Sequence, residues 1–365
     1  MTDETLKREC SIDLSFPFYP HETAGERLRT IADYMEREGL GGELYLGGRS
    51  VELLEAKIAD LIGMPDAVWF PTGTMAQGVA ARLYSQRTGR RQILLHPTSH
   101  LELHESGSYA HVHGLNANMI GEWSRPLVAD DLQADAACAI IELPQRHNGG
   151  ALPNWDELTN IKQRAAELDV PLHMDGARIW GTRPFYGNRS YAEISEGFSS
   201  VYVSFYKEIG ALAGAALSGD SDFCEEARTW RARMGGLTVA PWPAVPDTLR
   251  LLERRLPMMP DFVAQTGKLA ASLATIDGVV VTPEPPHVNM MHVQWACDAE
   301  TAKAARDEAA RQTGVWLCGS VWALERDDRC AMELVIGERA LSYDHQPIVD
   351  AVTIMMQTIR AARRN

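Results

Sequence analysis

Two short runs, each at the end of an apolar segment, contain side chains that could do chemistry together. The run HMDGAR at 173–178 contains Asp175 and Arg178, and the run VSFYKEIGALAG at 203–214 contains Lys207. An acid that salt-bridges a pyridinium nitrogen and a lysine that forms an imine are the two groups that a pyridoxal phosphate enzyme needs. The two runs therefore indicate chemistry on a bound pyridoxal ring.

Both residues also have a purely structural interpretation. Asp175 ends an apolar strand, where an unpaired carboxylate is costly, and Arg178 three residues later could neutralise it. Lys207 follows another apolar strand, and its amine could simply extend to solvent. Taken alone, these residues leave the structural and the catalytic interpretation open.

The turn Pro71-Thr72-Gly73-Thr74 leads from a short apolar segment into a helical one. A glycine at this place lets backbone N–H groups and the helix N-terminus approach an anion, and a threonine hydroxyl adds a further donor. An ordinary strand-to-helix turn with an N-cap has the same sequence. The turn becomes informative only together with the lysine and the aspartate.

A group of histidines raises the question of a metal site. In the run HLELHE, Glu102 follows His100 by two positions, whereas zinc-binding helices place a glutamate directly beside a histidine. We therefore expect no dedicated metal site, and one histidine could instead stack on a flat cofactor. The group consists of His96, His100, His104, His111 and His113.

Composition narrows the class of protein. The chain of 365 residues exceeds one compact core, so two lobes are expected. Its net charge of −14, with 35 basic against 49 acidic residues, argues against a nucleic-acid partner. The sequence contains no stretch of about 20 apolar residues and no signal-peptide core, which predicts a cytoplasmic protein without a membrane partner. The six scattered cysteines are then expected as free thiols.

Apolar strands alternate with helices over the first two thirds of the chain. The pattern predicts helices at 24–38, from Ser50, and at 155–168, with strands at 67–70, 92–96, 138–143, 170–174, 201–205 and 212–218. Such alternation is typical of a mostly parallel sheet covered on both faces. Ligands bind beyond the carboxyl ends of such strands, which is where the turn, Asp175 and Lys207 are expected.

The pattern of alternating strands and helices ends after Gly236, where several prolines suggest a hinge. A long helical stretch from Asp247, broken by Pro257 and Pro260, leads into strands near 279, at 288–294 and at 331–336, and helices at 300–312 and 346–362. We expect an N-terminal segment at 1–20, a large domain at 21–240 and a small α+β domain at 241–365.

Together, these runs resemble the threonine aldolase family, in the β-eliminating lyase branch of fold-type I pyridoxal phosphate enzymes. The likeness extends from about Leu14 to the last helix and is best between Phe70 and Gly219. It implies an α/β fold with a large, mostly parallel sheet domain and a smaller C-terminal α+β domain. It also implies pyridoxal 5'-phosphate as the cofactor and a homodimer or homotetramer, in which Tyr45 could reach a neighbouring active site.

The resemblance implies a role for each matching residue. Thr72, Gly73 and Thr74 form the phosphate loop, and Ser204 is a looser candidate for a phosphate ligand. A further block runs from Glu142 to His147-Asn148-Gly149-Gly150. The remaining assignments are His100 stacked on the ring, Asp175 on the pyridine nitrogen, Arg178 on the substrate carboxylate and Lys207 as the imine-forming lysine.

Three departures from the family pattern concern the substrate. Tyr206 stands where the aldolases have serine, and Glu333 stands where a second carboxylate-binding arginine is expected. An arginine that would reach a neighbouring subunit's phosphate aligns near Val239, with Arg231 and Arg233 a turn earlier. Glu333 is therefore a candidate substrate-binding residue of a different kind.

Three reactions follow from these residues. The first is cleavage of a β-hydroxy-α-amino acid, threonine-like or phenylserine-like, to glycine and an aldehyde, with His147 or His100 taking the hydroxyl proton. The second keeps the cofactor but performs β-elimination, transamination or racemisation, which Glu333 favours. The third is a metal-dependent hydrolase built on the histidine group.

Overall fold

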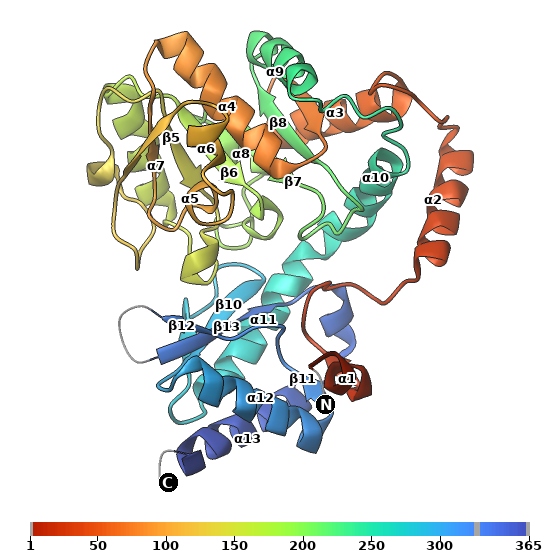
Figure 1. The fold of residues 1–365 in the computed structure, drawn as a ribbon, viewed down its shortest axis with the longest axis vertical. Coiled ribbons are helices and arrows are strands. Elements are labelled where there is room, and N and C mark those ends of the chain that lie inside the picture. The colour runs from red at the N-terminus through yellow and green to blue at the C-terminus, as the bar shows by residue number, and fades with distance from the viewer. Residues whose placement is uncertain (1–2, 325–328, 363–365) are drawn as a thin grey trace. The chain divides into compact units, whose positions relative to one another are not determined.

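The computed structural model describes residues 3–324 and 329–362, which divide into two compact units (Figure 1). The large unit comprises His21–His147 and Leu152–Pro257. The small unit comprises the described parts of Met1–Pro20, Asn148–Ala151 and Met258–Asn365. Within these residues, no helix is both long and apolar enough to cross a membrane.

The large unit is built on a seven-stranded sheet with the strand order β2-β8-β7-β6-β5-β3-β4. Strands β4, β3, β5, β6 and β7 are parallel, and β8 is antiparallel to both of its neighbours, so β2 runs in the same direction as β7. The carboxyl ends of β2, β7, β6, β5 and β3 therefore meet at one edge. The strands are β2 Asp66–Phe70, β3 Gln92–Leu95, β4 Asn116–Met119, β5 Cys138–Glu142, β6 Leu172–Gly176, β7 Ser200–Ser204 and β8 Ala215–Gly219.

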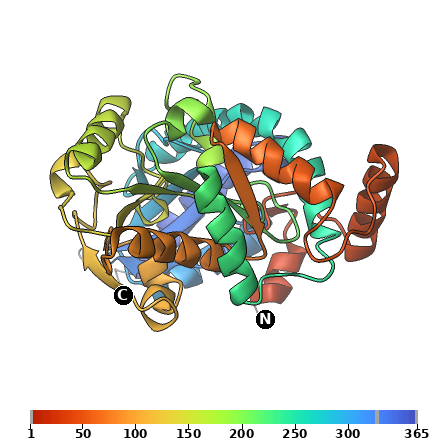
Figure 2. The same ribbon diagram turned by 90° about the horizontal axis from the view of Figure 1, so that it is seen from above.

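The central strands are covered on both faces. Every residue of β6, β7 and β8 is buried, which a strand with one solvated face cannot achieve. Figure 2 shows helices on either side of these strands. The expected mostly parallel, doubly covered sheet is thereby confirmed, apart from the antiparallel β8, which begins at Ala215 and not at residue 212.

The helices of the large unit follow local signals closely. The capping box of Thr23 and Glu26 begins α2, and that of Asn154 and Glu157 begins α7 as predicted. Helix α3 begins at Arg49, because Ser50 donates its N–H and its hydroxyl to Glu43 and does not act as the N-cap. The helices are α2 Ala24–Glu38, α3 Arg49–Ile62, α4 Gly73–Thr88, α5 His100–Leu103, α6 Ser108–His111, α7 Trp155–Glu167, α8 Tyr191–Ser195, α9 Ser221–Arg233 and α10 Ala244–Arg255.

The small unit contains a four-stranded antiparallel sheet with the order β12-β13-β10-β9 and a separate parallel pair, β1 and β11. Its strands are β1 Ile12–Asp13, β9 Val280–Thr282, β10 Met290–Trp295, β11 Val315–Trp316, β12 Trp322–Leu324 and β13 Arg329–Val335. Its helices are α1 Asp3–Glu9, α11 Met259–Ala274, α12 Ala299–Thr313 and α13 Gln346–Ala362. Short 3-10 turns lie at Ala129–Asp131, Arg146–Asn148, Ile179–Gly181, Leu256–Met258 and Glu338–Ser342.

The division of the chain differs from the boundary expected after residue 240. Helix α10 packs against α2 and α3, and its buried Asp247 accepts hydrogen bonds from Arg27 and from the N–H of Leu212, so the large unit continues to Pro257. The first 20 residues join the small unit, where β1 pairs with β11. Gly149 belongs there too, because a Cβ on it would lie 2.0 Å from the carbonyl oxygen of Thr282.

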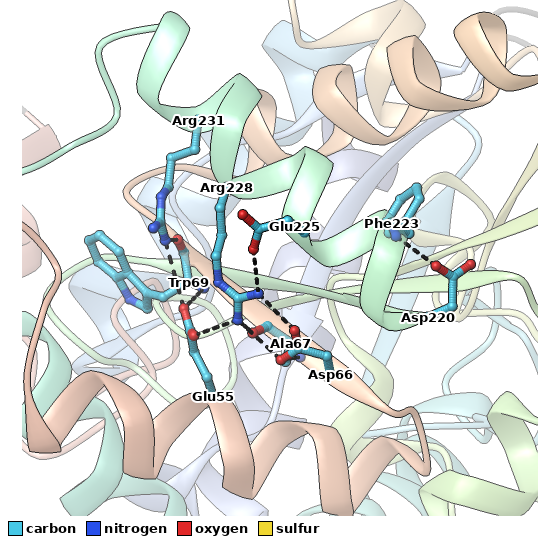
Figure 3. Close-up of polar contacts among 9 residues, drawn as sticks. All are labelled: Glu55, Asp66, Ala67, Trp69, Asp220, Phe223, Glu225, Arg228 and Arg231. Atoms are coloured by element: carbon cyan, nitrogen blue, oxygen red, sulfur yellow. Dashed lines mark hydrogen bonds and ion pairs between the residues drawn. The ribbon is translucent and has the colours of Figure 1, made fainter.

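Strand β2 is an edge strand whose free backbone groups are satisfied by side chains (Figure 3). Glu55 of α3 accepts the N–H of Trp69 at 2.7 Å. From α9, Arg228 donates to the carbonyl of Ala67 at 3.0 Å, and Arg231 donates to the carbonyl of Trp69. An exposed edge is open to pairing with other chains, and this network closes it. It also fixes the strand that leads into Thr72.

Replacing Arg231 by methionine should destabilise the large unit. The Arg231 side chain is only 7% exposed. Its loss leaves the Trp69 carbonyl without its side-chain donor and removes the cation that lies 3.7 Å from Glu55, while Arg228 remains at 3.1 Å. We expect a loss of about 2 kcal/mol in the free energy of unfolding, measured by urea titration of the holoenzyme. Arg233→Met is the matched control, because Arg233 is exposed on the same helix and should cost about 0.5 kcal/mol or less. Equal effects of the two changes would contradict this account of the edge.

Candidate active site

The residues singled out from the sequence come together at the carboxyl edge of the large sheet. The phosphate-loop candidates follow β2, His100 follows β3, and Lys207 lies three residues beyond β7. Asp175 lies in β6, where it pairs with Glu142 of β5 on one side and with Tyr202 of β7 on the other. The parallel topology thus explains why groups far apart in the sequence share one site.

The loop after β2 fits an anion. Thr72 is the N-cap of the 16-residue helix α4, and its Oγ1 accepts the N–H of Met75 at 3.3 Å. A Cβ on Gly73 would lie 2.1 Å from the hydroxyl oxygen of Tyr202, so only glycine fits there. The Oγ of Ser204 is buried and has no hydrogen-bond partner among the described residues. A helix N-terminus with unsatisfied donors is suited to a phosphate.

Asp175 is buried, and it is not paired with Arg178 in the part of the chain that the structure describes. Its Oδ1 accepts the N–H of Ala177 at 3.1 Å. Burial raises the pKa of this carboxyl, while the positive charges of Lys207 and His100 act in the opposite direction. A carboxylate in such surroundings calls for a cationic hydrogen-bond donor, which a protonated ring nitrogen provides.

Lys207 and Glu142 are both shifted toward their neutral forms. Burial, followed by the positive charge of Arg178, lowers the pKa of Lys207 to about 8. Burial and the nearby Asp175 raise the pKa of Glu142 to about 7. One oxygen of Glu142 accepts the N–H of Arg146 at 3.0 Å, and the other is buried without a partner among the described residues. Shifts of this kind are typical of functional sites.

Arg178 is half-buried directly after β6. In residues 3–324 and 329–362 its guanidinium has no hydrogen-bond or ion-pair partner. A planar guanidinium presents donors in a fork that binds a carboxylate through two parallel hydrogen bonds. The side chain is therefore available for an acidic ligand group.

Three histidines gather at the same edge. His100 contacts the buried Glu105 through Nδ1 at 3.0 Å, which fixes the orientation of its ring. Nε2 of His104 lies 2.7 Å from Nε2 of His147. The pairing was missed from the sequence, where His104 entered only the metal hypothesis. Strands β3 and β5, which precede the two residues, are neighbours, and only that topology reveals the contact.

The other residues singled out from the sequence have the following places in the fold. Tyr45 is 61% exposed on the loop before α3, where its N–H donates to the carbonyl of Val239 at 2.9 Å. Glu333 belongs to β13 of the small unit, opposite His292 of β10. Arg231 contributes to the β2 edge and is not available as a phosphate ligand for a neighbouring subunit. Among the described residues, no group of three or more His, Cys, Asp or Glu side chains is arranged to hold a metal ion.

A family model described as beta-eliminating lyase matches residues 26–296, which is more than half of the chain. The chain belongs to the β-eliminating lyase family. Its curated relatives include the low specificity L-threonine aldolase of Escherichia coli K12, 28% identical over 59% of this chain and 66% of that protein. An uncharacterised protein of Caenorhabditis elegans, R102.4, is 29% identical over 64% of this chain and 58% of its own length. The chain thus spans less than two thirds of the length of these relatives.

Solved structures of similar proteins match a larger share of this chain than the curated relatives do. A putative L-allo-threonine aldolase from Listeria monocytogenes EGD-E has 32% identity and a TM-score of 0.88, covering 97% of this chain and 99% of that one. Sphingomonas wittichii serine palmitoyltransferase shares the fold alone, with 13% identity and a TM-score of 0.70. The resemblance to threonine aldolases, the fold class and the cofactor pyridoxal 5'-phosphate, expected from the sequence, are thereby confirmed.

Proposed function

We propose that this chain is a pyridoxal phosphate-dependent lyase that cleaves a β-hydroxy-α-amino acid, threonine-like or phenylserine-like, to glycine and an aldehyde. The observation that supports it most is the meeting of Asp175, Arg178 and Lys207 at one sheet edge beside the His104–His147 contact. Membership of the β-eliminating lyase family and similarity to threonine aldolases support the same reaction.

The residues present fit the cofactor. Thr72, Gly73, Thr74 and Ser204 would hold its phosphate, Asp175 its ring nitrogen and Lys207 its carbonyl carbon, while His100 would lie on its ring. When bound, the cofactor withdraws the electrons of the bond that breaks at Cα. The buried oxygens of Ser204 and Glu142 without described partners are consistent with a site completed by a polar ligand.

The side chains then divide the work of the reaction. Arg178 binds the substrate carboxylate and so orients the Cα–Cβ bond. Asp175 would keep the ring nitrogen of the bound cofactor protonated. Lys207, whose pKa burial and Arg178 lower to about 8, would hold the cofactor and can give up or take a proton near neutral pH. His147 takes the hydroxyl proton of the substrate as the bond breaks, with His100 held by Glu105 as the alternative proton acceptor.

The test is a product analysis with the purified holoenzyme. Threonine, allo-threonine and phenylserine in both configurations at Cα, and a panel of β-substituted amino acids, are incubated with the enzyme. We expect glycine and the matching aldehyde from at least one β-hydroxy amino acid. Pyruvate and ammonia from a β-substituted amino acid, without glycine from any substrate, would show β-elimination and contradict the proposal.

We also propose that the protein is cytoplasmic and works as a homodimer or homotetramer. Two adjacent loops expose large apolar side chains, Leu44 and Tyr45 on one and Val239 and Trp242 on the other. Apolar groups gathered in this way are typical of a surface that another protein covers. The described cysteines are free thiols, which is consistent with a reducing compartment.

A further inference from the structure

His104 and His147 meet head to head. Their Nε2 atoms are 2.7 Å apart, their ring centroids are 5.0 Å apart and their planes differ by 11°. The centroid distance exceeds the nitrogen distance by about two ring radii, so the rings lie edge to edge along the line of the two nitrogens and are not stacked face to face. At this distance one nitrogen must donate a proton and the other must accept it.

The surroundings favour a neutral pair, with one proton between the two Nε2 atoms. Burial lowers the pKa of His104, and the positive charges of His100, Arg146, Lys207 and Arg178 lower it further. The His100 ring lies 5.2 Å from that of His104 between centroids. A further proton would turn one of the two rings into an imidazolium cation among these charges, so the neutral pair is favoured near neutral pH.

We propose that His104 is a positioning residue that fixes the tautomer of His147 and takes over its proton during cleavage. In the resting pair, Nε2–H of His147 donates to Nε2 of His104, and Nδ1 of His147 is then the proton acceptor. This inference rests on the proposed aldol cleavage. It also gives His104 a role, which the assignments of His100 and His147 alone do not.

The proton balance of the step is complete. The substrate O–H bond breaks and its proton forms an N–H bond at Nδ1 of His147. The electron pair of the O–H bond forms the C=O bond of the aldehyde, while the Cα–Cβ electrons stay with Cα. His147 passes its Nε2 proton to Nε2 of His104, whose exposed side chain can release a proton to water. A proton from water then forms the new C–H bond at Cα of glycine, so water is the only further reactant.

The experiment compares two reactions in three variants of the holoenzyme. The variants are His104→Phe, which removes the nitrogens, His104→Gln, which can restore one hydrogen bond, and His111→Phe, a control at a histidine outside the pair. The first reaction is cleavage of the β-hydroxy amino acid. The second is exchange of the Cα proton of glycine in heavy water, which uses Asp175 and Lys207 but involves no hydroxyl proton.

For His104→Phe we expect kcat of cleavage to fall about 10- to 100-fold, which is smaller than the full effect of losing a catalytic base. The rate of glycine exchange should change less than about threefold. His104→Gln should recover most of the rate, and His111→Phe should behave as wild type. Equal losses in both reactions, or unchanged cleavage, would overturn the proposal.

Nitrogen NMR of the cofactor-free protein with labelled histidine gives a readout independent of turnover. We expect one protonated and one unprotonated Nε2 in the pair, and His104→Phe should change the tautomer signals of His147. Two Nε2 atoms of the same kind in wild type would overturn the pairing. A wild-type enzyme that forms no glycine would instead refute the cleavage reaction itself, so the two failures are distinguishable.

Discussion

Replacing Lys207 by alanine should leave a folded protein that no longer holds its cofactor covalently and forms glycine about 10⁴-fold more slowly. Lys207 is the amine at the carboxyl edge of the large sheet whose pKa burial and Arg178 lower to about 8. In the proposed reaction it serves both as the nucleophile for the cofactor carbonyl and as a proton carrier at neutral pH. The measurements are the visible absorbance of the dialysed protein and the rate of glycine formation.

Lys162 provides a matched control for this change. Burial lowers its pKa to about 8 as well, but its amine donates to the carbonyl of Ile194 at 3.0 Å in the same unit. Lys162→Met should keep the visible absorbance and most of the activity. If Lys207→Ala retained the absorbance after dialysis, or if Lys162→Met lost it, the assignment of Lys207 would be wrong.

The pKa of Lys207 also predicts how the cofactor-free protein recovers its cofactor. Only the neutral amine attacks a carbonyl, and lowering the pKa from 10.5 to about 8 increases the neutral fraction at any pH below 10. The rate of covalent reconstitution should therefore rise between pH 7 and 9 and then level off. A rate that continued to rise toward pH 10.5 would indicate an unperturbed lysine.

Much of the fold follows from local patterns in the sequence. The mostly apolar segments that form β5, β6 and β7 are long enough to be recognised from the sequence, and the cap residues Thr23 and Asn154 mark helices α2 and α7. Helix α9 escaped notice because its residues from Ser221 to Arg233 are mostly polar, with a narrow apolar face. Its role depends on Arg228 and Arg231, whose partners on β2 lie about 160 positions earlier in the chain.

The site shows the same distinction between local and distant information. Asp175 was identified because it ends an apolar strand and Lys207 because it follows one, which are local signals, and the parallel topology then brings them together. The contact between His104 and His147 depends on two strands being neighbours, and Glu333 stands in a unit with its own sheet. Residues whose role depends on a distant partner cannot be assigned from spacing alone.

Asp175→Asn should reduce glycine formation about 10²- to 10³-fold while the cofactor remains bound. Asparagine has the shape of aspartate but no negative charge, so it cannot keep a ring nitrogen protonated. Lys207 and the loop at 72–74 are untouched, and the visible absorbance should persist. Glu142→Gln is the comparison, because Glu142 pairs with Asp175 across the strands while burial and Asp175 raise its own pKa to about 7. We expect it to cost much less activity.

Urea unfolding of Asp175→Asn shows whether its loss of activity comes from a less stable fold. Burial raises the pKa of Asp175 above its usual value, so in the cofactor-free protein its ionisation destabilises the folded state once the pH exceeds the pKa of the unfolded chain. A neutral amide in place of the carboxylate removes that cost. Cofactor-free Asp175→Asn should therefore resist urea at pH 7 at least as well as wild type, and the difference should vanish in acid, where both forms are neutral. A variant that is less stable than wild type at pH 7, or one with activity within about fivefold of it, would mean that Asp175 serves the fold and not the ring nitrogen.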